Sequence, residues 1–166
     1  RFPFASRRGS SGQWQTEPGR GGLVTAHLPV LRHRGGMWIG WTGAPGEDQE
    51  LTNALDAVGK GAGYTLKGVP LTDQEIHDFY LGFSNEIVWP LFHDLQSLCN
   101  FDPVYWRTYR LVNRKYAHVV RQTPEPGDFI WVHDYHLVNM AAELRRAGVT
   151  SRIGFFLHIP FPPLDL

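Results

Sequence analysis

The clearest hydrophobic pattern lies near the carboxyl end of the chain. Residues 129–132 form a continuous apolar run, which is typical of a strand covered on both faces. Apolar residues then recur at helical spacing over 137–144, and Gly148 marks the end of that helix. A second buried strand is predicted over 152–157. Strand, helix and strand within about 30 residues predict a βαβ unit with parallel strands and a right-handed crossover.

Two further helices are marked by their start signals. Residues 72–75 (TDQE) form a capping box, which predicts a helix through Tyr80. We expect the segment 82–85 (GFSN) to interrupt it and a second piece to run over 86–89. Asp102 followed by Pro103 is a second start signal, and the apolar residues from Tyr105 to Val119 repeat at four-three spacing, as on one helix face.

The first 70 residues carry weaker signals. Residues 1–20 are polar and predict a surface loop or a flexible arm. A helix opens at 19–22, is shortened or kinked by Pro29, and stops at Gly35-Gly36. Short strands are predicted over 37–41 and 64–69, with a loop over 42–50, whereas the secondary structure of 51–61 is ambiguous.

Composition narrows the class of protein. The 166 residues have a formal net charge of zero without a basic cluster, which argues against nucleic acid as a partner. Cys99 is the one cysteine, so no intrachain disulfide forms. No apolar run approaches the ~20 residues that span a bilayer, so we expect no membrane segment. The chain starts at Arg1 and stops after a Pro-rich turn, and we therefore expect it to be a fragment.

Two polar residues stand at the ends of the predicted parallel strands. Asp134 follows the first strand, and His158 follows the next. Ligands of open parallel sheets bind beyond the carboxyl ends of the strands, so we expect both side chains to face one crevice. A carboxylate there suits ligand hydroxyls.

Two other interpretations of the same stretch stay open. Three histidines, His133, His136 and His158, together with Asp134 could hold zinc, but they do not share the spacing of a helix-borne metal motif. We therefore expect no metal. Alternatively, His133 and His136 satisfy the backbone at the start of the following helix.

Weaker signals lie elsewhere. Gly21-Gly22 precede a helix, where free N–H groups favour phosphate, although two glycines also simply make a tight turn. Tyr80 and Trp89 could stack on a sugar, although isolated aromatic residues on a helix more often belong to the core.

Several stretches, in order, resemble the trehalose-6-phosphate synthase family. They are Gly21-Gly22-Leu23, GGMWIGWTG (35–43), FYLGFSNEIVWPLFH (79–93), WVHDYHL (131–137) and RIGFFLHIPFP (152–162). The resemblance implies an α/β fold, the Rossmann-like amino-terminal domain of a GT-B glycosyltransferase, with a mostly parallel sheet and helices on both faces. It also implies transfer of glucose from UDP-glucose to glucose 6-phosphate with retention of configuration, without metal or cofactor.

The family's site residues map onto named positions. Arg1 would contact the acceptor phosphate, and Tyr80, Trp89 and Asp134 would bind the acceptor sugar. His158 would lie beside the transferred glucose, and Gly22 would approach the donor phosphates. Asp134 and His158 are thus the expected catalytic pair, with Asp134 orienting the acceptor. Trp41 is a further candidate near the acceptor.

The resemblance leaves related functions open. A glucosylglycerol-phosphate synthase uses ADP-glucose and glycerol 3-phosphate, a pseudo-glycosyltransferase joins cyclitols, and regulatory relatives bind sugar phosphate without turnover. Residues 1–166 match part of an amino-terminal domain, so we expect the first strand and the donor-binding carboxy-terminal domain to be missing and the fragment to be inactive. We also expect small-molecule substrates, a cytoplasmic location and a homo-oligomer.

Overall fold

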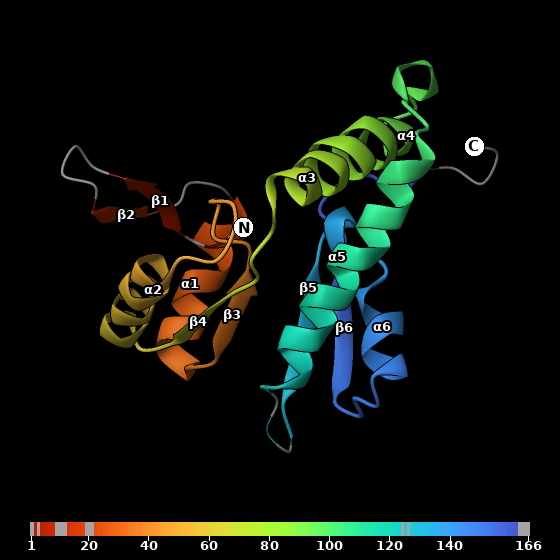
Figure 1. Cartoon of the computed structure of the whole chain (residues 1–166). Coiled ribbons are helices and arrows are strands. Elements are labelled where there is room, and N and C mark those ends of the chain that lie inside the picture. The colour runs from red at the N-terminus through yellow and green to blue at the C-terminus, as the bar shows by residue number, and fades with distance from the viewer. Residues whose placement is uncertain are drawn as a thin grey trace. The chain divides into compact units, whose positions relative to one another are not determined.

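The chain folds as two compact units, Arg1–Thr72 and Asp73–Leu166. A computed structural model describes residues 2, 4–8, 13–18, 22–123, 125 and 127–162 (Figure 1). Within these ranges no helix combines the length and apolarity needed to cross a membrane.

The first unit contains one antiparallel and one parallel strand pair. The antiparallel pair is followed by α1, and the parallel pair has α2 between its strands. In chain order the elements are β1 (Phe4–Arg8), β2 (Trp14–Pro18), α1 (Gly22–Arg34), β3 (Met37–Gly40), α2 (Gln49–Ala62) and β4 (Thr65–Gly68).

Three expectations for this unit are corrected. The prediction of a surface loop over 1–20 is wrong, because β1 and β2 pair there with Phe4 opposite Pro18. Pro29 does not shorten α1, which continues for 13 residues. Residues 51–61 are helical, because Asp48 caps α2 by accepting a hydrogen bond from the Leu51 N–H at 3.0 Å. The strands predicted over 37–41 and 64–69 are confirmed as β3 and β4.

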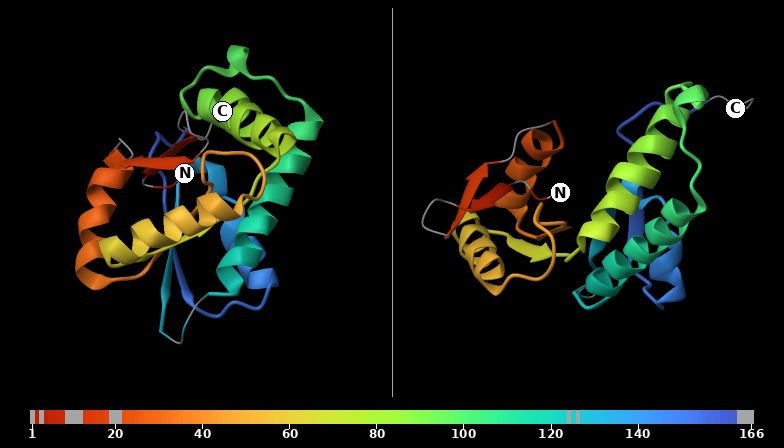
Figure 2. Two further views of the ribbon diagram at one scale, coloured as in Figure 1. Left: turned by 60° about the vertical axis from the view of Figure 1, so that its left-hand side comes forward. Right: turned by 45° about the horizontal axis from the view of Figure 1, so that its top comes forward.

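The second unit is built on a parallel pair of strands and a long antiparallel helix pair (Figure 2). Its elements are α3 (Asp73–Glu75), the π-helix η1 (Ile76–Val88), α4 (Trp89–Phe92), the 3-10 helix η2 (Gln96–Leu98), α5 (Pro103–Arg121), β5 (Phe129–His133), the 3-10 helix η3 (Tyr135–Leu137), α6 (Met140–Arg146) and β6 (Arg152–Phe156).

The predicted βαβ unit is confirmed in its order and its parallel strands. Phe129 lies opposite Arg152, and His133 lies opposite Phe156. The expectation that both strands are covered on both faces is wrong: Val132 is buried, but Trp131 and Phe156 are about half exposed, at 49% and 50%. An apolar run indicates that a strand is hydrophobic, but it does not indicate which faces of the strand are covered by other elements.

The helical stretch from Asp73 to Phe92 is continuous, so the predicted interruption at 82–85 is wrong. Polar side chains in that segment instead support a π-helix, whose backbone bonds run from i to i−5. Ser84 Oγ donates to the Phe79 carbonyl at 2.8 Å, and Asn85 Nδ2 donates to the Tyr80 carbonyl at 2.6 Å. Each side chain thus bonds the carbonyl five residues back.

Gly82 lets η1 approach α5 closely. A Cβ at this position would lie 2.7 Å from the ring of Tyr105. The two helices therefore pack with a buried seam, in which Phe79 and Tyr109 are almost fully buried and their ring centroids are 5.7 Å apart.

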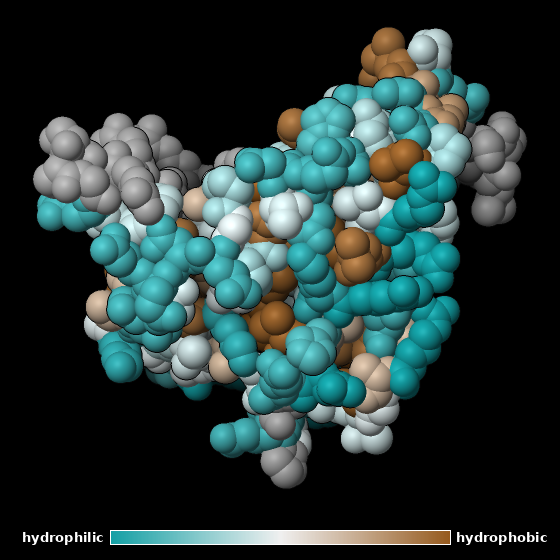
Figure 3. All heavy atoms as spheres, viewed as in Figure 1, coloured by the Kyte–Doolittle hydropathy of each residue, from teal (hydrophilic) through white to brown (hydrophobic). Residues whose placement is uncertain are grey.

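The start of α5 confirms the predicted cap, since Asp102 accepts a hydrogen bond from the Val104 N–H at 2.8 Å. Ion pairs between partly exposed basic side chains of α5 and buried glutamates tie α5 to its neighbours. Lys115 reaches Glu75 at 2.6 Å, and Arg114 reaches Glu143 on α6 at 3.5 Å. On the face shown in Figure 3, hydrophilic residues predominate and hydrophobic residues form separate patches.

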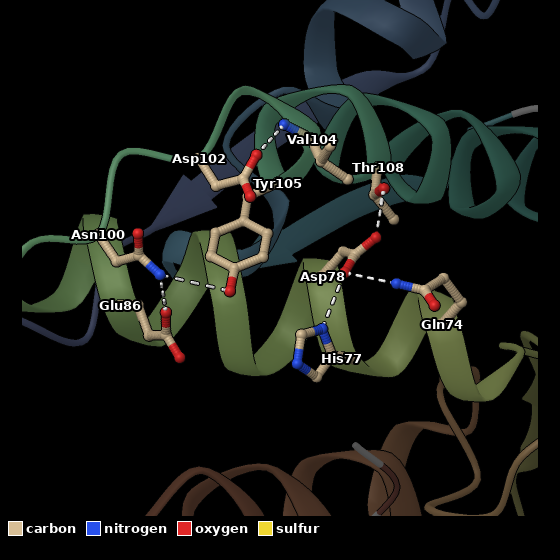
Figure 4. Close-up of polar contacts among 9 residues, drawn as sticks. All are labelled: Gln74, His77, Asp78, Glu86, Asn100, Asp102, Val104, Tyr105 and Thr108. Carbon is tan, nitrogen blue, oxygen red and sulfur yellow. Dashed lines mark hydrogen bonds and ion pairs between the residues drawn. The ribbon is translucent and has the colours of Figure 1, made fainter.

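A buried carboxylate, Asp78, links η1 to α5 (Figure 4). It accepts hydrogen bonds from Gln74 at 2.8 Å and Thr108 at 3.2 Å, and it lies 2.8 Å from His77 Nδ1. Burial alone would raise the pKa of Asp78, but the hydrogen bonds from His77, Gln74 and Thr108 together outweigh it and lower that pKa below its ordinary value.

Asp78 should therefore contribute to acid sensitivity. Because its pKa in the folded state is lowered, its contribution is fully present above the unfolded pKa of about 4 and is lost as the pH falls through the folded value. We expect Asp78→Asn to lower the free energy of unfolding at pH 7 by about 1–3 kcal/mol and to flatten its decline below pH 4. Urea unfolding at pH 3 to 7 checks this, with the exposed Asp56→Asn as control. An unchanged acid decline in Asp78→Asn would contradict it.

Candidate functional site

Asp134 sits in a strained turn at the end of β5. Its backbone angles, φ 73° and ψ 166°, fall in a region that is essentially reserved for glycine and costs about 1–3 kcal/mol. The Asp134 N–H continues the strand pairing by donating to the Phe156 carbonyl at 2.8 Å, and η3 begins at the next residue. A non-glycine residue held in this conformation points to a role for its side chain.

The prediction that Asp134 and His158 lie together is confirmed. Asp134 Oδ1 accepts a hydrogen bond from the Tyr135 N–H at 2.9 Å and a long one from the His158 N–H at 3.4 Å. These bonds fix the carboxyl group at the ends of both strands and occupy Oδ1. Within the described ranges no bond to Oδ2 is found, so Oδ2 can accept a hydrogen bond from a ligand hydroxyl.

The His158 side chain is held by a second histidine. His158 Nε2 lies 3.0 Å from His133 Nδ1, and the two rings stack with centroids 5.3 Å apart. One of these nitrogens donates the hydrogen bond and the other accepts it. In the part of the chain that the structure describes, no group of three or more His, Cys, Asp or Glu residues is placed to hold a metal ion.

Side chains of α5 anchor the turn that carries Asp134 by hydrogen bonds. The Tyr109 hydroxyl donates to the Tyr135 carbonyl at 2.7 Å and accepts from the Val138 N–H at 3.1 Å. Asn113 Nδ2 donates to the His136 carbonyl at 3.2 Å. Burial raises the pKa of the Tyr109 hydroxyl, so it stays protonated and keeps both bonds.

His136 is not the helix cap considered from the sequence, because the capping bond at this turn comes from Asp134. The His136 ring stacks on Tyr80 at 5.2 Å with an interplanar angle of 13° and on Tyr135 at 4.1 Å. Burial lowers its pKa to about 4, against an opposing effect of Asp134, so the ring is neutral at physiological pH.

The two candidate sugar-binding aromatics lie on one helical stretch. Tyr80 is partly buried, whereas Trp89 is 39% exposed. Tyr80 joins the Asp134 turn through His136, and the Tyr135 hydroxyl donates to Asn85 Oδ1 at 3.0 Å. The structure thus brings Tyr80, Asp134 and His158 into one contact network in the second unit.

The remaining candidates belong to the first unit. Arg1 lies outside the described residues. Gly22 is the first residue of α1, it is exposed, and a Cβ there would meet nothing within 4 Å. Since packing in its unit does not demand a glycine and the first turn of α1 has no acidic residue, the helix start remains suited to phosphate. Trp41 is buried, and its indole donates to the Ala44 carbonyl at 2.9 Å.

Two hollows on the second unit lie along α5 rather than at the strand ends. One is lined by Arg107, Arg110, Leu111 and Arg114, and the other lies between α5 and α6 around Arg121 and Glu143. Neither includes Asp134 or His158, so the predicted crevice at those residues stays a prediction.

Sequence reasoning missed the supports of this site. The repeat from Tyr105 to Val119 predicts a helix through Tyr109 and Asn113, but it predicts neither their bonds to the Asp134 turn nor the stack of His136 on Tyr80. The four-residue spacing of Tyr105, Tyr109 and Asn113 signals one buried face of α5, but no local pattern says that this face meets a turn 26 residues later.

Comparison with known proteins places this geometry in a family. A trehalose-6-phosphate synthase from Mycolicibacterium vanbaalenii is 40% identical over the whole chain, which spans 34% of that protein. One from Salmonella arizonae is 44% identical over 89% of the chain and 30% of its own length. A bifunctional trehalose-6-phosphate synthase/phosphatase from Thermoproteus tenax is 43% identical over 88% of the chain and 20% of its own length. The chain therefore spans about a third or less of these relatives.

Solved structures agree. The E. coli structure bound with UDP-2-fluoro glucose is 35% identical with a TM-score of 0.75, over 91% of this chain and 33% of that one. An alpha,alpha-trehalose-phosphate synthase (UDP-forming) from Burkholderia xenovorans, in complex with glucose-6-phosphate, is 36% identical with a TM-score of 0.71, over 86% of this chain and 31% of that one. The predicted α/β fold of a GT-B glycosyltransferase is confirmed. The model of glycosyltransferase family 20 matches residues 1–166, and the chain belongs to that family.

Proposed function

We propose that the full-length protein is an alpha,alpha-trehalose-6-phosphate synthase, which transfers glucose from UDP-glucose to glucose 6-phosphate with retention of configuration. One observation carries the proposal: Asp134, in a strained conformation beside His158, keeps Oδ2 open at the ends of two parallel strands. The likeness to synthases from three organisms supports the same reaction. In this proposal the present residues form the acceptor side, and the donor diphosphate is held by residues outside them.

The reaction proposed is a front-face displacement at the anomeric carbon of the donor glucose. The acceptor hydroxyl forms a bond to that carbon while the bond to the UDP phosphate breaks, and the leaving phosphate takes up the hydroxyl proton. Asp134 Oδ2 accepts a hydrogen bond from an acceptor hydroxyl and so orients the sugar. His158 lies beside the transferred glucose and contributes a hydrogen bond where charge develops.

The other proposed roles follow the family pattern. Tyr80 and Trp89 pack against the acceptor, Arg1 binds its phosphate through a forked guanidinium, and Gly22 at the start of α1 approaches the donor phosphates. Both substrates are cytoplasmic metabolites, which supports a cytoplasmic enzyme. A homo-oligomer stays a prediction.

An assay of the full-length protein with paired substrates tests the proposal. We expect UDP release from UDP-glucose to depend on glucose 6-phosphate, with the product in the configuration of the donor by NMR. Preference for glycerol 3-phosphate with ADP-glucose would instead indicate a glucosylglycerol-phosphate synthase. Calorimetric binding of glucose 6-phosphate without turnover would indicate a regulatory relative, and neither binding nor turnover would reject the proposal.

A further inference from the structure

Each candidate acceptor aromatic has one ring face covered by a histidine. His136 stacks on Tyr80 with an interplanar angle of 13°, and His93 stacks on Trp89 with ring centroids 4.0 Å apart and an angle of 26°. The two contacts are independent, since His136 comes from η3 and His93 from the turn after α4. A shared arrangement at both rings needs a common explanation.

The fold does not need an imidazole at position 136. Among the residues that the structure describes, its buried Nε2 has no hydrogen-bond partner, which costs free energy. A hydrocarbon ring would fill the same gap beside Tyr80 and Tyr135 without that cost. Phe79 also contacts the ring, edge-on at 6.3 Å. The contacts around position 136 therefore require a flat, rigid ring that packs against Tyr80, and they do not require an imidazole.

His93 is fixed differently but to the same effect. Its Nδ1 lies 2.6 Å from the Trp89 carbonyl, so the imidazole is anchored to the backbone of the residue on which it stacks. Trp89 is 39% exposed, and an exposed indole without such a contact would sample several rotamers. The stack limits that freedom, and the exposed part of the indole is accessible to a ligand.

The π-helix places the two supported rings on one side. Tyr80 and Trp89 are nine residues apart, which in an α-helix of 3.6 residues per turn is about two and a half turns and puts them on opposite faces. Bonds from i to i−5 widen each turn, so nine residues make about two turns. The Trp89 N–H donates to the Ser84 carbonyl, which confirms that the π register reaches Trp89.

We propose that His136 and His93 are positioning residues that hold the rings of Tyr80 and Trp89 by stacking, and that they thereby set the affinity for the sugar-phosphate acceptor. This inference rests on the proposed function of the same site. In this proposal the flat ring of each histidine holds the neighbouring aromatic ring by stacking, and the basicity of the imidazole plays no part. An aromatic replacement should therefore serve, whereas an aliphatic one of similar bulk should not.

The test compares His136→Phe with His136→Leu in the full-length protein. Aromatic contacts of this kind correspond to a factor of roughly 3 to 10, so we expect His136→Leu to raise the KM for glucose 6-phosphate by about that factor. The KM for UDP-glucose and kcat should change less than twofold. His136→Phe should restore the acceptor KM and its pH profile to those of the wild type.

Matched variants separate positioning from general damage. His118→Leu makes the same change at an exposed position of α5 and should leave every constant unchanged. His93→Leu should raise the acceptor KM as His136→Leu does. If thermal unfolding shows that His136→Leu does not fold, the acceptor KM of His93→Leu alone tests the positioning role.

Two results would overturn the inference: an unchanged acceptor KM in folded Leu variants, or a His136→Phe protein as impaired as His136→Leu. Turnover by the wild-type protein tests the proposed function separately from this inference. Without turnover, the same variant ratios are read from the calorimetric Kd for glucose 6-phosphate, and absence of wild-type binding overturns both.

Discussion

Asp134→Asn should lower kcat/KM for glucose 6-phosphate by about 10- to 150-fold, the equivalent of losing a hydrogen bond to a charged acceptor worth roughly 1.5–3 kcal/mol. The asparagine carbonyl can still accept from Tyr135 and His158, so the turn should keep its shape. The amide group then replaces Oδ2 and donates where the carboxylate accepted. Steady-state kinetics with varied glucose 6-phosphate, together with the melting temperature, measures both effects.

Two variants control for strain and charge. Asp94 is another aspartate at positive φ, 59°, and it is exposed, so Asp94→Asn should change neither activity nor melting temperature. Asp134→Gly relieves the strained backbone but loses the capping bond, two effects of about 1–3 and 0.5–2 kcal/mol that nearly cancel. It should melt close to the wild type while losing as much activity as Asp134→Asn. Full activity in either Asp134 variant would end the proposed role.

Tyr109→Phe should produce the largest loss of stability among conservative changes in the second unit. Removing one hydroxyl leaves the Tyr135 carbonyl and the Val138 N–H without their buried partner, at roughly 2–4 kcal/mol for the two groups together. Both groups belong to the turn after Asp134, so the KM for the acceptor should rise as well. Urea unfolding and steady-state kinetics on the same preparations check the two effects.

The chain offers a matched control in Tyr64. Its hydroxyl is buried and has no hydrogen-bond partner within the described part of the first unit, and burial raises its pKa. Tyr64→Phe should therefore be neutral or slightly stabilising, since it removes a buried polar group and breaks no bond. Equal destabilisation by Tyr64→Phe and Tyr109→Phe would show that the Tyr109 hydrogen bonds do not hold the turn.

The βαβ unit could be read from the sequence because local signals agreed there. Apolar runs, a helical repeat and Gly148 gave strand, helix and strand in the correct order, and the parallel pairing brought Asp134 to His158. The cap of α5 was equally local, since Asp102 and Pro103 need no distant partner. Elements whose ends are fixed by neighbouring residues are those that a sequence specifies most directly.

The errors arose where a local signal was overridden. The segment 82–85 (GFSN) contains turn-forming residues. However, the side chains of Ser84 and Asn85 donate hydrogen bonds to carbonyls five residues back, which supports a wider helix instead of ending it. The polar segment before α1 became a hairpin through pairing of β1 with β2, which periodicity over either strand alone does not reveal. Pairing and π register both depend on partners that a single window does not contain.

The sequence predicted that Asp134 and His158 lie close together, but it did not predict the contacts that support them. The closeness of Asp134 and His158 follows from topology, whereas the stack of His136 on Tyr80 joins segments that are distant in the sequence. The positive φ of Asp134 and the stack of His93 on Trp89 are local, but no sequence pattern signals them. A histidine beside a strand end looks like a ligand or a cap in the sequence. The structure gives His136 a third use, as a neutral ring between two tyrosines.

The most direct measurement is a crystal structure of the full-length protein with glucose 6-phosphate and UDP. The proposed function predicts Asp134 Oδ2 within about 2.6–3.2 Å of a hydroxyl of the acceptor sugar, with the sugar in contact with Tyr80 and Trp89. A sugar phosphate bound elsewhere, with Asp134 facing only protein atoms, would contradict it.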